Sequence, residues 1–441
     1  MKQYRTFYLF VVIFILLGNF TFSQKDSISL AVCLSKANEN FPLIKQRGLL
    51  SESSSLKIKN IAADNFPNLS LNGQATYQSD VTNVSLVMPE IPGIGQIPSP
   101  DMPVPSKDQY KISLDVSQPI WDGGISKSRK NIENASLEAD LQNVEVDIYK
   151  LWPQINNLYF SILVYEKNIE TINLLSSELK DKLLVAQSAL RNGVADSSSI
   201  EIINAELINI ERQIIELEEG KRASVEMLKT IILFEIDDNT FFSIPNPGDF
   251  IIEGNRPELK LFELNRQKIE VSEKLISGKS SPKIYGFGQL GYGRPGLNML
   301  SDDFDSFWIV GAKVSWNITD LKKNSREKQI LEISKDMINV QEDVFKNSVD
   351  VQREKIEAEI TKYNSLAEKS KELYEIRKSI AEKSSSKFKN GVISSNDLIS
   401  DLNAKTRALL NLEFYKLQLI KAEVDLLTTN GNLKIYANEN K

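Results

Sequence analysis

Hydrophobic side chains recur alternately three and four residues apart from residue 148 to residue 190, within a helix expected over residues 125–190. A heptad repeat sustained over so many turns is typical of a left-handed coiled coil, and such a helix would span roughly 100 Å at about 1.5 Å per residue. Pro153 predicts a local kink, and residues 200–231 repeat the spacing as a returning helix. The repeat consists of Ile148, Leu151, Ile155, Leu158, Ile162, Tyr165, Ile169, Ile172, Leu179, Leu183, Ala186 and Leu190, with Ser176 as its polar interruption.

Strict alternation of apolar and polar side chains predicts four β-strands, at residues 69–77, 110–117, 284–292 and 307–316. Each has about nine residues, the length that crosses a bilayer when the strand is tilted. Between the first two strands, residues 79–108 are rich in Pro, Gly and Ser and predict a long irregular loop. Aromatic residues lie near the strand ends, where a membrane barrel carries an aromatic girdle: Tyr77, Tyr110, Tyr292, Trp308 and Trp316.

Two similar stretches interrupt the helices, Arg191-Asn192-Gly193-Val194 and Lys389-Asn390-Gly391-Val392. Asn-Gly favours a tight turn because both residues tolerate positive φ. Residues 197–199 and 394–397 follow the two turns and offer helix-capping side chains. Each stretch therefore predicts the tip of a helical hairpin.

The chain reads as an internal duplication. Pro42 and Pro67 recur 215 residues later as Pro257 and Pro282, whereas Gly193 recurs 198 residues later as Gly391. The difference of 17 falls in the hairpin loops, since residues 79–108 are longer than 293–306. The predicted organisation is a signal peptide (1–23), a first repeat (24–236, hairpin 68–117, tip 191–196), a linker (237–254), a second repeat (255–430, hairpin 284–316, tip 389–394) and a tail (431–441).

The N-terminus resembles a secretory signal peptide. Lys2 and Arg5 precede an apolar run over residues 7–17, and small residues stand before a cleavage point at Gln24. A helix is expected from residue 26 to residue 63, capped by Ser27 or Ser29 and broken near Pro42. Cys33, the sole cysteine, is either a lipid-modified residue or a small core residue of this helix.

Composition excludes several classes of protein. The net charge of −6 is mild, and gives no support for nucleic-acid binding. The chain has no histidine and one cysteine, which removes imidazole bases, His metal ligands and Cys-based metal sites. Residues 286–291 fit G-x-G-x-x-G, but no helix follows, so no nucleotide site is expected. We therefore expect no enzyme and no cofactor.

Asp397 and Asp401 lie one helical turn apart after the second tip. One interpretation is a solvated helix start, since acidic residues favour the first turn. The other is a ring of charge at a channel constriction. The sequence leaves both open.

Four strands cannot close a barrel, which needs about eight, and open sheet edges are not tolerated in lipid. Several copies must therefore share one barrel, with polar faces toward a lumen and coiled-coil helices continuing the wall as an α-helical tube. The fold class expected is mainly α with a small transmembrane β part.

The chain resembles the TolC-like outer membrane efflux family over essentially the whole mature sequence. The residues that carry the resemblance are Asn40-Phe41-Pro42 and Asn255-Arg256-Pro257, the stretch Gln118-Pro119-Ile120-Trp121-Asp122-Gly123-Gly124, and the two Asn-Gly-Val turns. The resemblance implies a homotrimer with a twelve-stranded barrel in outer membrane lipid and a helical body in the periplasm. It also implies that both tips dock a periplasmic adaptor, which bridges to an inner-membrane pump of the RND or ABC type.

In this family Asp397 matches a gating aspartate, while Ser400 stands at the partner position, with Asp401 next to it, and Ser199 is the first-repeat equivalent. The implied function is the exit duct of a tripartite efflux or type I secretion system. Dedicated protein export and a structural periplasmic coiled-coil spacer are the alternatives.

Overall fold

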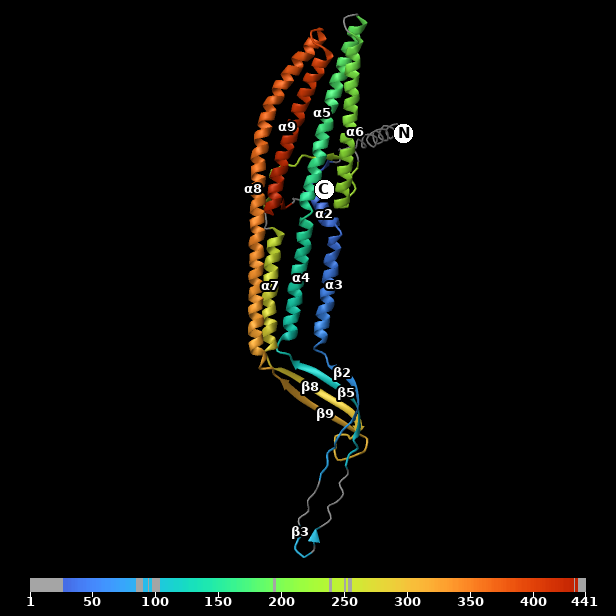
Figure 1. The fold of residues 1–441 in the computed structure, drawn as a ribbon, viewed down its shortest axis with the longest axis vertical. Helices are drawn as coiled ribbons and strands as arrows, with labels where there is room; N and C mark the ends of the chain where they lie inside the picture. The colour runs from blue at the N-terminus through green and yellow to red at the C-terminus, as the bar shows by residue number, and fades with distance from the viewer. Residues whose placement is uncertain are drawn as a thin grey trace, which may run out of the picture. The chain divides into compact units, whose positions relative to one another are not determined.

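The computed structural model describes residues 27–84, 90–93, 95–96, 104–192, 196–237, 240–249, 251–252, 256–431 and 433–434. The expected signal peptide (1–23), Gly193 and Val194 lie outside the described residues. Long helices and one four-stranded sheet make up most of the chain (Figure 1), which confirms the expected mainly α fold with a small β part. None of the described helices is both long and apolar enough to cross a membrane.

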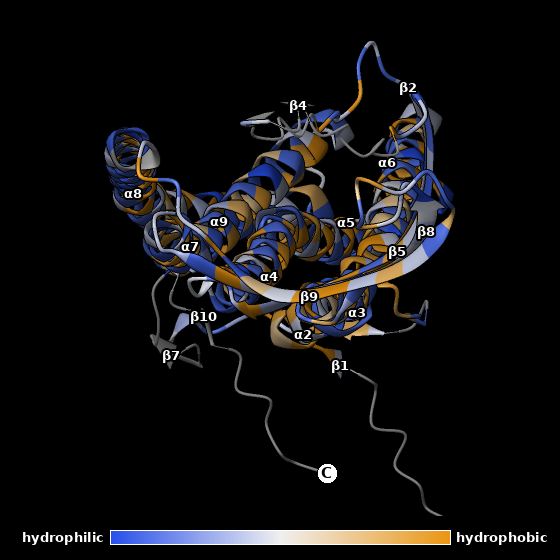
Figure 2. Cartoon of the chain, turned by 90° about the horizontal axis from the view of Figure 1, so that it is seen from below, coloured by the Kyte–Doolittle hydropathy of each residue, from blue (hydrophilic) through white to orange (hydrophobic). Residues whose placement is uncertain are grey.

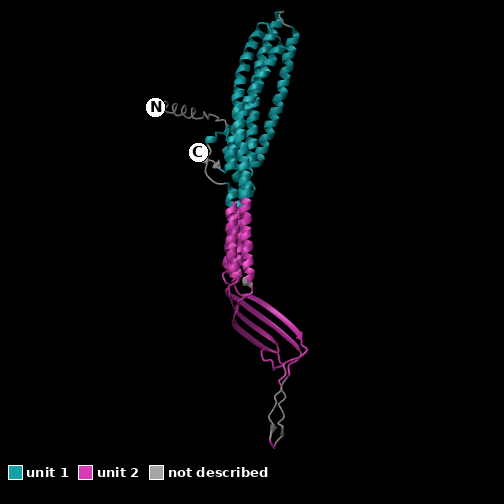
Figure 3. Cartoon of the chain, turned by 60° about the vertical axis from the view of Figure 1, so that its left-hand side comes forward, with its two compact units in different colours: residues 1–46, 142–260, 343–441 teal, residues 47–141, 261–342 magenta. Residues whose placement is uncertain are grey.

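The chain divides into two compact units (Figure 3), and both repeats contribute to each. Unit 1 comprises residues 1–46, 142–260 and 343–441, and unit 2 comprises residues 47–141 and 261–342. The units therefore do not coincide with the predicted repeats.

Unit 2 contains a curved antiparallel sheet in the order β2-β5-β8-β9 (Figure 2). Its strands are β2 (Asn68–Tyr77), β5 (Asp108–Trp121), β8 (Lys283–Arg294) and β9 (Asp305–Ser315). Leu71 pairs with Leu114, Leu114 with Leu290, and Leu290 with Trp308, so apolar residues of all four strands share one face. The alternation in the sequence thus predicts the two faces correctly.

The helical part of unit 2 is a row of four segments joined by side-chain contacts. They belong to α3 (Leu43–Ala63), α4 (Ile125–Tyr149), α7 (Pro257–Lys279) and α8 (Asp320–Lys389). Lys57 on α3 pairs with Glu133 on α4 at 3.1 Å. Lys268 on α7 donates to Ser136 on α4 at 3.0 Å, and Lys335 on α8 pairs with Glu270 on α7 at 3.3 Å.

Unit 1 is built on α2 (Leu30–Asn40), α5 (Trp152–Arg191), α6 (Ser197–Ile232) and α9 (Ser395–Asn430). One core cluster includes Leu34, Tyr159 and Leu228, and a second includes Leu179 and Leu398. Five buried side chains of α5 belong to the predicted heptad repeat: Ile155, Ile162, Ile172, Leu179 and Ala186. Other buried residues, among them Tyr159, Phe160 and Leu163, lie beside the repeat. The spacing in the sequence therefore identifies only part of the buried face.

Cys33 lies in the first core cluster and is fully buried on α2. Burial raises the pKa of its thiol to about 12. The structure supports the core interpretation of this residue rather than the lipid-modified one, because an acyl chain has no room at a closed core position.

The structure refines the expected local structure at four points. The helix expected over 125–190 is two helices, because Pro153 enters the first turn of α5 and cannot continue the hydrogen-bond ladder of α4. Of the two expected caps, Ser29 is confirmed as the N-cap of α2, while Ser27 belongs to β1 (Ser27–Ile28). The linker 237–254 contains β6 (Phe241–Phe242), the short helix η1 (Pro247–Asp249) and β7 (Ile251–Ile252). The loop 79–108 includes a small pair of strands, β3 (Glu90–Ile91) and β4 (Gly95–Gln96).

These short strands tie distant segments together. β1 pairs with β6 in parallel, and β7 pairs with β10 (Leu433–Lys434), which lies in the expected tail. A strand of two residues is too short to show an alternation of apolar and polar side chains, so these pairings are recognised only in the folded chain.

The two repeats also correspond in their secondary structure. Helices α6 and α9 each have 36 residues and begin 198 residues apart. Their C-caps, Leu233 (φ 47°) and Gly431 (φ 80°), are both left-handed and also 198 apart. At the equivalent of Pro153 the second repeat has Val351, and α8 runs through this point as one helix of 70 residues.

Candidate functional site

The second predicted tip is a well-formed helix end. Gly391 adopts a positive φ of 68°. The Gly391 N–H donates to the carbonyl of Phe388 at 3.0 Å, and the Val392 N–H donates to that of Lys387 at 2.9 Å. This pair of bonds is the Schellman motif, which satisfies the last carbonyls of a helix and favours Gly at the left-handed position. Lys389 and Asn390 complete the end of α8.

Ser394 and Asp397 then start α9 with a capping box. The Asp397 N–H donates to Ser394 Oγ at 3.2 Å, while the Asp397 carboxylate accepts from the backbone N–H of Ser394 at 3.2 Å and from its hydroxyl at 2.7 Å. This reciprocal arrangement satisfies two of the free donors at the helix start. The predicted cap at 394–397 is therefore confirmed.

The first predicted tip is described on both sides of its turn. Arg191 ends α5, and the Asn192 N–H donates to the Ser188 carbonyl at 3.2 Å. Asp196 caps α6 by accepting from the backbone N–H of Ser198 at 2.8 Å. The expected cap at 197–199 is wrong by one position, because Asp196 is the N-cap and those serines are already helical.

The two predicted gate carboxylates are engaged within their own hairpin. The hydrogen bonds from Ser394 lower the pKa of the Asp397 carboxyl below its ordinary value. Asp401 accepts from the hydroxyl of Ser384 on α8 at 2.5 Å. Both carboxylates therefore have partners near the start of α9, which agrees with the helix-start interpretation. A gating role stays a prediction.

Two polar contacts between the hairpins carry no signal in the sequence. Lys405 on α9 pairs with Glu178 on α5, and Asn403 on α9 donates to Glu206 on α6 at 2.7 Å. In the sequence, these four residues look like ordinary solvent-exposed residues of a helix. Only the packing of α9 against α5 and α6 brings each pair together.

The predicted girdle residues fall at both ends of the sheet. Tyr77, Tyr110 and Tyr292 lie at the end away from the helices, and Trp308 lies two pairs further in. Trp316 follows β9 at the opposite end, where its indole N–H donates to the Ser280 carbonyl at 2.9 Å.

Two further residues, Phe304 and Arg294, join the aromatic group at the far end of the sheet. The ring of Phe304 stacks on Tyr292 at 5.6 Å between centroids, and Arg294 lies over Phe304 at 5.5 Å. Both lie outside the predicted strands, because β8 extends to Arg294, beyond the predicted end at residue 292, and Phe304 directly precedes β9.

The second face of the sheet carries a polar network. Asp115 on β5 accepts hydrogen bonds from Asn72 on β2 and from Gln289 on β8. Lys111 donates to Gln289 at 3.0 Å and lies 5.1 Å from the ring centroid of Phe307. The network links three strands on the face opposite the apolar one, which suits contact with water.

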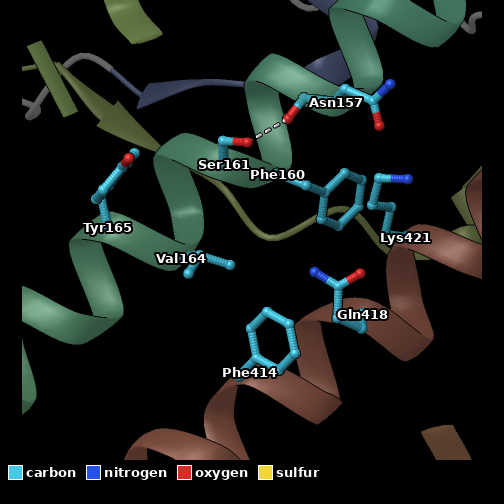
Figure 4. Close-up of a pocket in the computed structure, with 8 residues that line it drawn as sticks. All are labelled: Asn157, Phe160, Ser161, Val164, Tyr165, Phe414, Gln418 and Lys421. Atoms are coloured by element: carbon cyan, nitrogen blue, oxygen red, sulfur yellow. Dashed lines mark hydrogen bonds between the residues drawn. The ribbon is translucent and has the colours of Figure 1, made fainter. Parts of the chain in front are cut away.

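A cavity of about 600 Å³ lies between α5 and α9 (Figure 4). Phe160, Val164 and Phe414 line it together with Gln418. Ser161, at its edge, donates to the Asn157 carbonyl at 2.8 Å. Across the described ranges, no group of three or more Cys, Asp or Glu side chains could hold a metal ion.

The structure resembles several solved outer membrane proteins. The outer-membrane channel OprN matches with a TM-score of 0.62 and 13% identity, covering 91% of this chain and 90% of its own. The open-state outer membrane channel MtrE of Neisseria gonorrhoeae matches with a TM-score of 0.60 and 14% identity, covering 91% and 89%. The outer membrane protein VceC of Vibrio cholerae matches with a TM-score of 0.55 and 13% identity, covering 91% and 96%. No family model and no curated protein matches the sequence.

Proposed function

We propose that this chain, which has the fold of outer membrane channels, forms a channel through the outer membrane in which three copies share one β-barrel. The fold agrees with the one that the resemblance to the TolC-like family implies. The single observation that carries the proposal is the exposed sheet of unit 2, with one apolar face and two free edges.

The apolar face of the sheet is incompatible with water. Leu71 is 71% exposed, Trp308 71% and Val310 74%. Removing apolar surface from water is favourable by about 25 cal/mol for each Å², and these side chains forgo that free energy while they stay exposed. Contact with lipid tails removes this cost, while the polar face around Asp115 lines a lumen.

The edges of the sheet favour association of copies. Among the described strands, none pairs with the outer edge of β2 or of β9. An unpaired edge cannot remain in hydrocarbon. Because four antiparallel strands alternate in direction, β9 of one copy lies antiparallel to β2 of the next, and three copies give a closed barrel of the size that leaves an aqueous channel.

We propose that the helical hairpins reach into the periplasm and that their tips dock a periplasmic adaptor of an inner-membrane pump. Val392 offers an exposed apolar side chain at the second tip. The channel catalyses nothing, and the pump supplies the energy for efflux or type I secretion. Dedicated protein export fits the same geometry. A structural spacer does not, since it has no use for a lipid-facing sheet.

The conductance of purified protein in planar bilayers tests the channel. We expect discrete steps, and Lys313→Asp, on the polar face of β9, should change the ion selectivity while leaving assembly intact. Val310→Asp, three residues away on the apolar face, should prevent insertion. A folded, water-soluble protein without conductance would overturn the proposal, as would equal effects of the two substitutions.

Docking at the tips needs a separate test. Gly193→Trp with Gly391→Trp should abolish export while conductance persists, because only the tips are altered. Export that continues undiminished would show that the adaptor binds elsewhere.

A further inference from the structure

We infer that Gly291 on β8 and Gly311 on β9 set the width of the lumen, because each lets an aromatic ring of the opposite strand lie against the wall. The two glycines thereby determine the size of the largest molecule that the barrel admits. The inference rests on the proposed function, which places the polar face of the sheet in the lumen.

The polar face of the sheet includes two phenylalanines, Phe287 on β8 and Phe307 on β9. Phe307 pairs with Gly291, and Gly291 pairs with Ser113. Ser113 shares its face with Asp115, two residues further along β5, and Phe287 shares its face with Gly291, four residues away on β8. Side chains in a strand stand roughly perpendicular to the sheet, so both rings would be expected to project into the lumen.

Phe307 lies across the neighbouring strand instead. A Cβ built on Gly291 would lie within 2.8 Å of three atoms of the Phe307 ring, Cζ, Cε1 and Cε2, whereas carbon atoms pack at about 3.5–4.0 Å. The ring thus occupies the space that any other side chain at this position would fill. Only 7% of Phe307 is exposed, against 71% of Trp308, its neighbour on the other face. Gly291 is also the last glycine of the Gly-x-Gly-x-x-Gly stretch at residues 286–291, which therefore has a use in the sheet.

Lys111 on β5 contributes to the cover of the same ring. Its Nζ lies over the Phe307 ring, 5.1 Å from the centroid, and donates to Gln289 Oε1 at 3.0 Å. A cation within about 6 Å of a ring centroid is attracted to the face of the ring. This contact favours the position of the ring against the wall over a position in the lumen.

The arrangement recurs with the two strands exchanged. Phe287 on β8 pairs with Gly311 on β9, and a Cβ added to Gly311 would lie 2.8 and 2.9 Å from Cζ and Cε1 of the Phe287 ring. The two pairs are four residues apart, about 13 Å along the strands. Each strand therefore supplies one ring and one glycine, and the lumen is kept open at two levels.

The first hairpin has polar side chains at the equivalent positions. The offsets of 215 and 198 residues place Thr76 and Gln109 at the positions of Gly291 and Phe307, and these two residues also pair. The equivalents of the other ring and glycine are a second polar pair, Asn72 and Ser113. Among the residues of β2 and β5, no glycine lies on this face, and none is needed where no ring has to be accommodated.

The length of a phenyl side chain makes its orientation decisive for the lumen. A ring that covers the neighbouring strand reaches about 4.8 Å sideways, the spacing of strands in a sheet. An upright ring would reach about as far into the lumen. Twelve strands at this spacing, tilted by about 40°, form a barrel with a backbone radius of about 12 Å. Three upright rings at one level, one from each copy, would therefore narrow the lumen substantially.

The size of the largest polyethylene glycol that enters the barrel tests the inference. Polymers of graded size are added to the extracellular side of a planar bilayer, and each polymer that enters lowers the single-channel conductance. Gly291→Ala should exclude the largest polymers that the unaltered channel admits, because the added methyl group displaces the Phe307 ring from the wall. Gly291→Ala with Phe307→Ala should admit them again. Phe307→Ala alone should leave the size limit unchanged, because its ring already lies outside the lumen.

The matched control is Gly288→Ala, three residues earlier on β8 and on the apolar face. A Cβ added there meets one atom within 4 Å, the Ile309 carbonyl oxygen at 3.9 Å, so the size limit should stay unchanged. If Gly291→Ala does not assemble, Gly311→Ala with and without Phe287→Ala makes the same comparison at the second level. Phe307→Ala alone tests the position of the ring even if neither glycine variant assembles.

The outcomes separate this inference from the proposed function. Conducting channels whose size limit is unchanged in Gly291→Ala, or stays low after Phe307→Ala is added, would overturn the inference alone. A higher limit in Phe307→Ala by itself would do the same, since the ring would then already stand in the lumen. An unaltered protein without conductance would overturn the proposed function and the inference with it.

Discussion

The turn at Gly391 is the most direct test of the tip geometry. Its φ of 68° lies in the left-handed region, and a Cβ added there would meet no atom within 4 Å. Gly391→Ala therefore introduces backbone strain without a clash. The substitution isolates one physical effect at the site where the adaptor is proposed to bind.

The cost follows from two opposing effects. An L-residue in the left-handed region loses about 1–2 kcal/mol, while Ala regains about 0.4–1 kcal/mol by restricting the unfolded chain. The balance is roughly 1 kcal/mol, or about fivefold in the population of the opened tip. Gly391→Asn should cost less, since Asn tolerates this conformation.

Amide hydrogen exchange read by mass spectrometry measures this opening. We expect roughly fivefold faster exchange at residues 387–398 in Gly391→Ala, a smaller change in Gly391→Asn and no change in the middle of α5. Unchanged exchange at the tip in Gly391→Ala would refute the left-handed turn. Equal acceleration along the whole of α8 and α9 would refute its local character.

Three further outcomes are expected. Leu233→Gly should leave the length of α6 unchanged and raise thermal stability slightly, because it relieves a left-handed Leu; a clear loss of stability in a melting curve would contradict this. The lowered pKa of Asp397 means that its capping contribution is present above the ordinary carboxyl pKa of about 3.9 and is lost as the pH falls through the folded value. Amide hydrogen exchange at the start of α9 should therefore become faster below about pH 4. Asp397→Ala, which has no carboxylate to protonate, should show no such pH-dependent change. Cys33, with a pKa of about 12, should react with maleimide only after denaturation; labelling of the folded protein would show an open α2.

Much of the candidate site could be predicted from the sequence, because it depends on local chemistry. Asn-Gly at a helix break, Ser394 three residues before Asp397, and alternation along the strands each act over a few residues. The misplaced cap at Asp196 shows the limit of this reasoning, because several adjacent polar residues compete for one N-cap and the backbone chooses among them.

By itself, the sequence determined the heptad helices, the four strands with their two faces, and the duplication, since periodicity is set by the geometry of helix and strand. Only the tertiary structure decided which segments meet. The pairing of β5 with β8, the ties of β1 to β6 and of β7 to β10, and the bonds that engage Asp397 and Asp401 join residues that no local pattern relates. These contacts depend on neighbours that are distant in the sequence, and only folding brings such neighbours together.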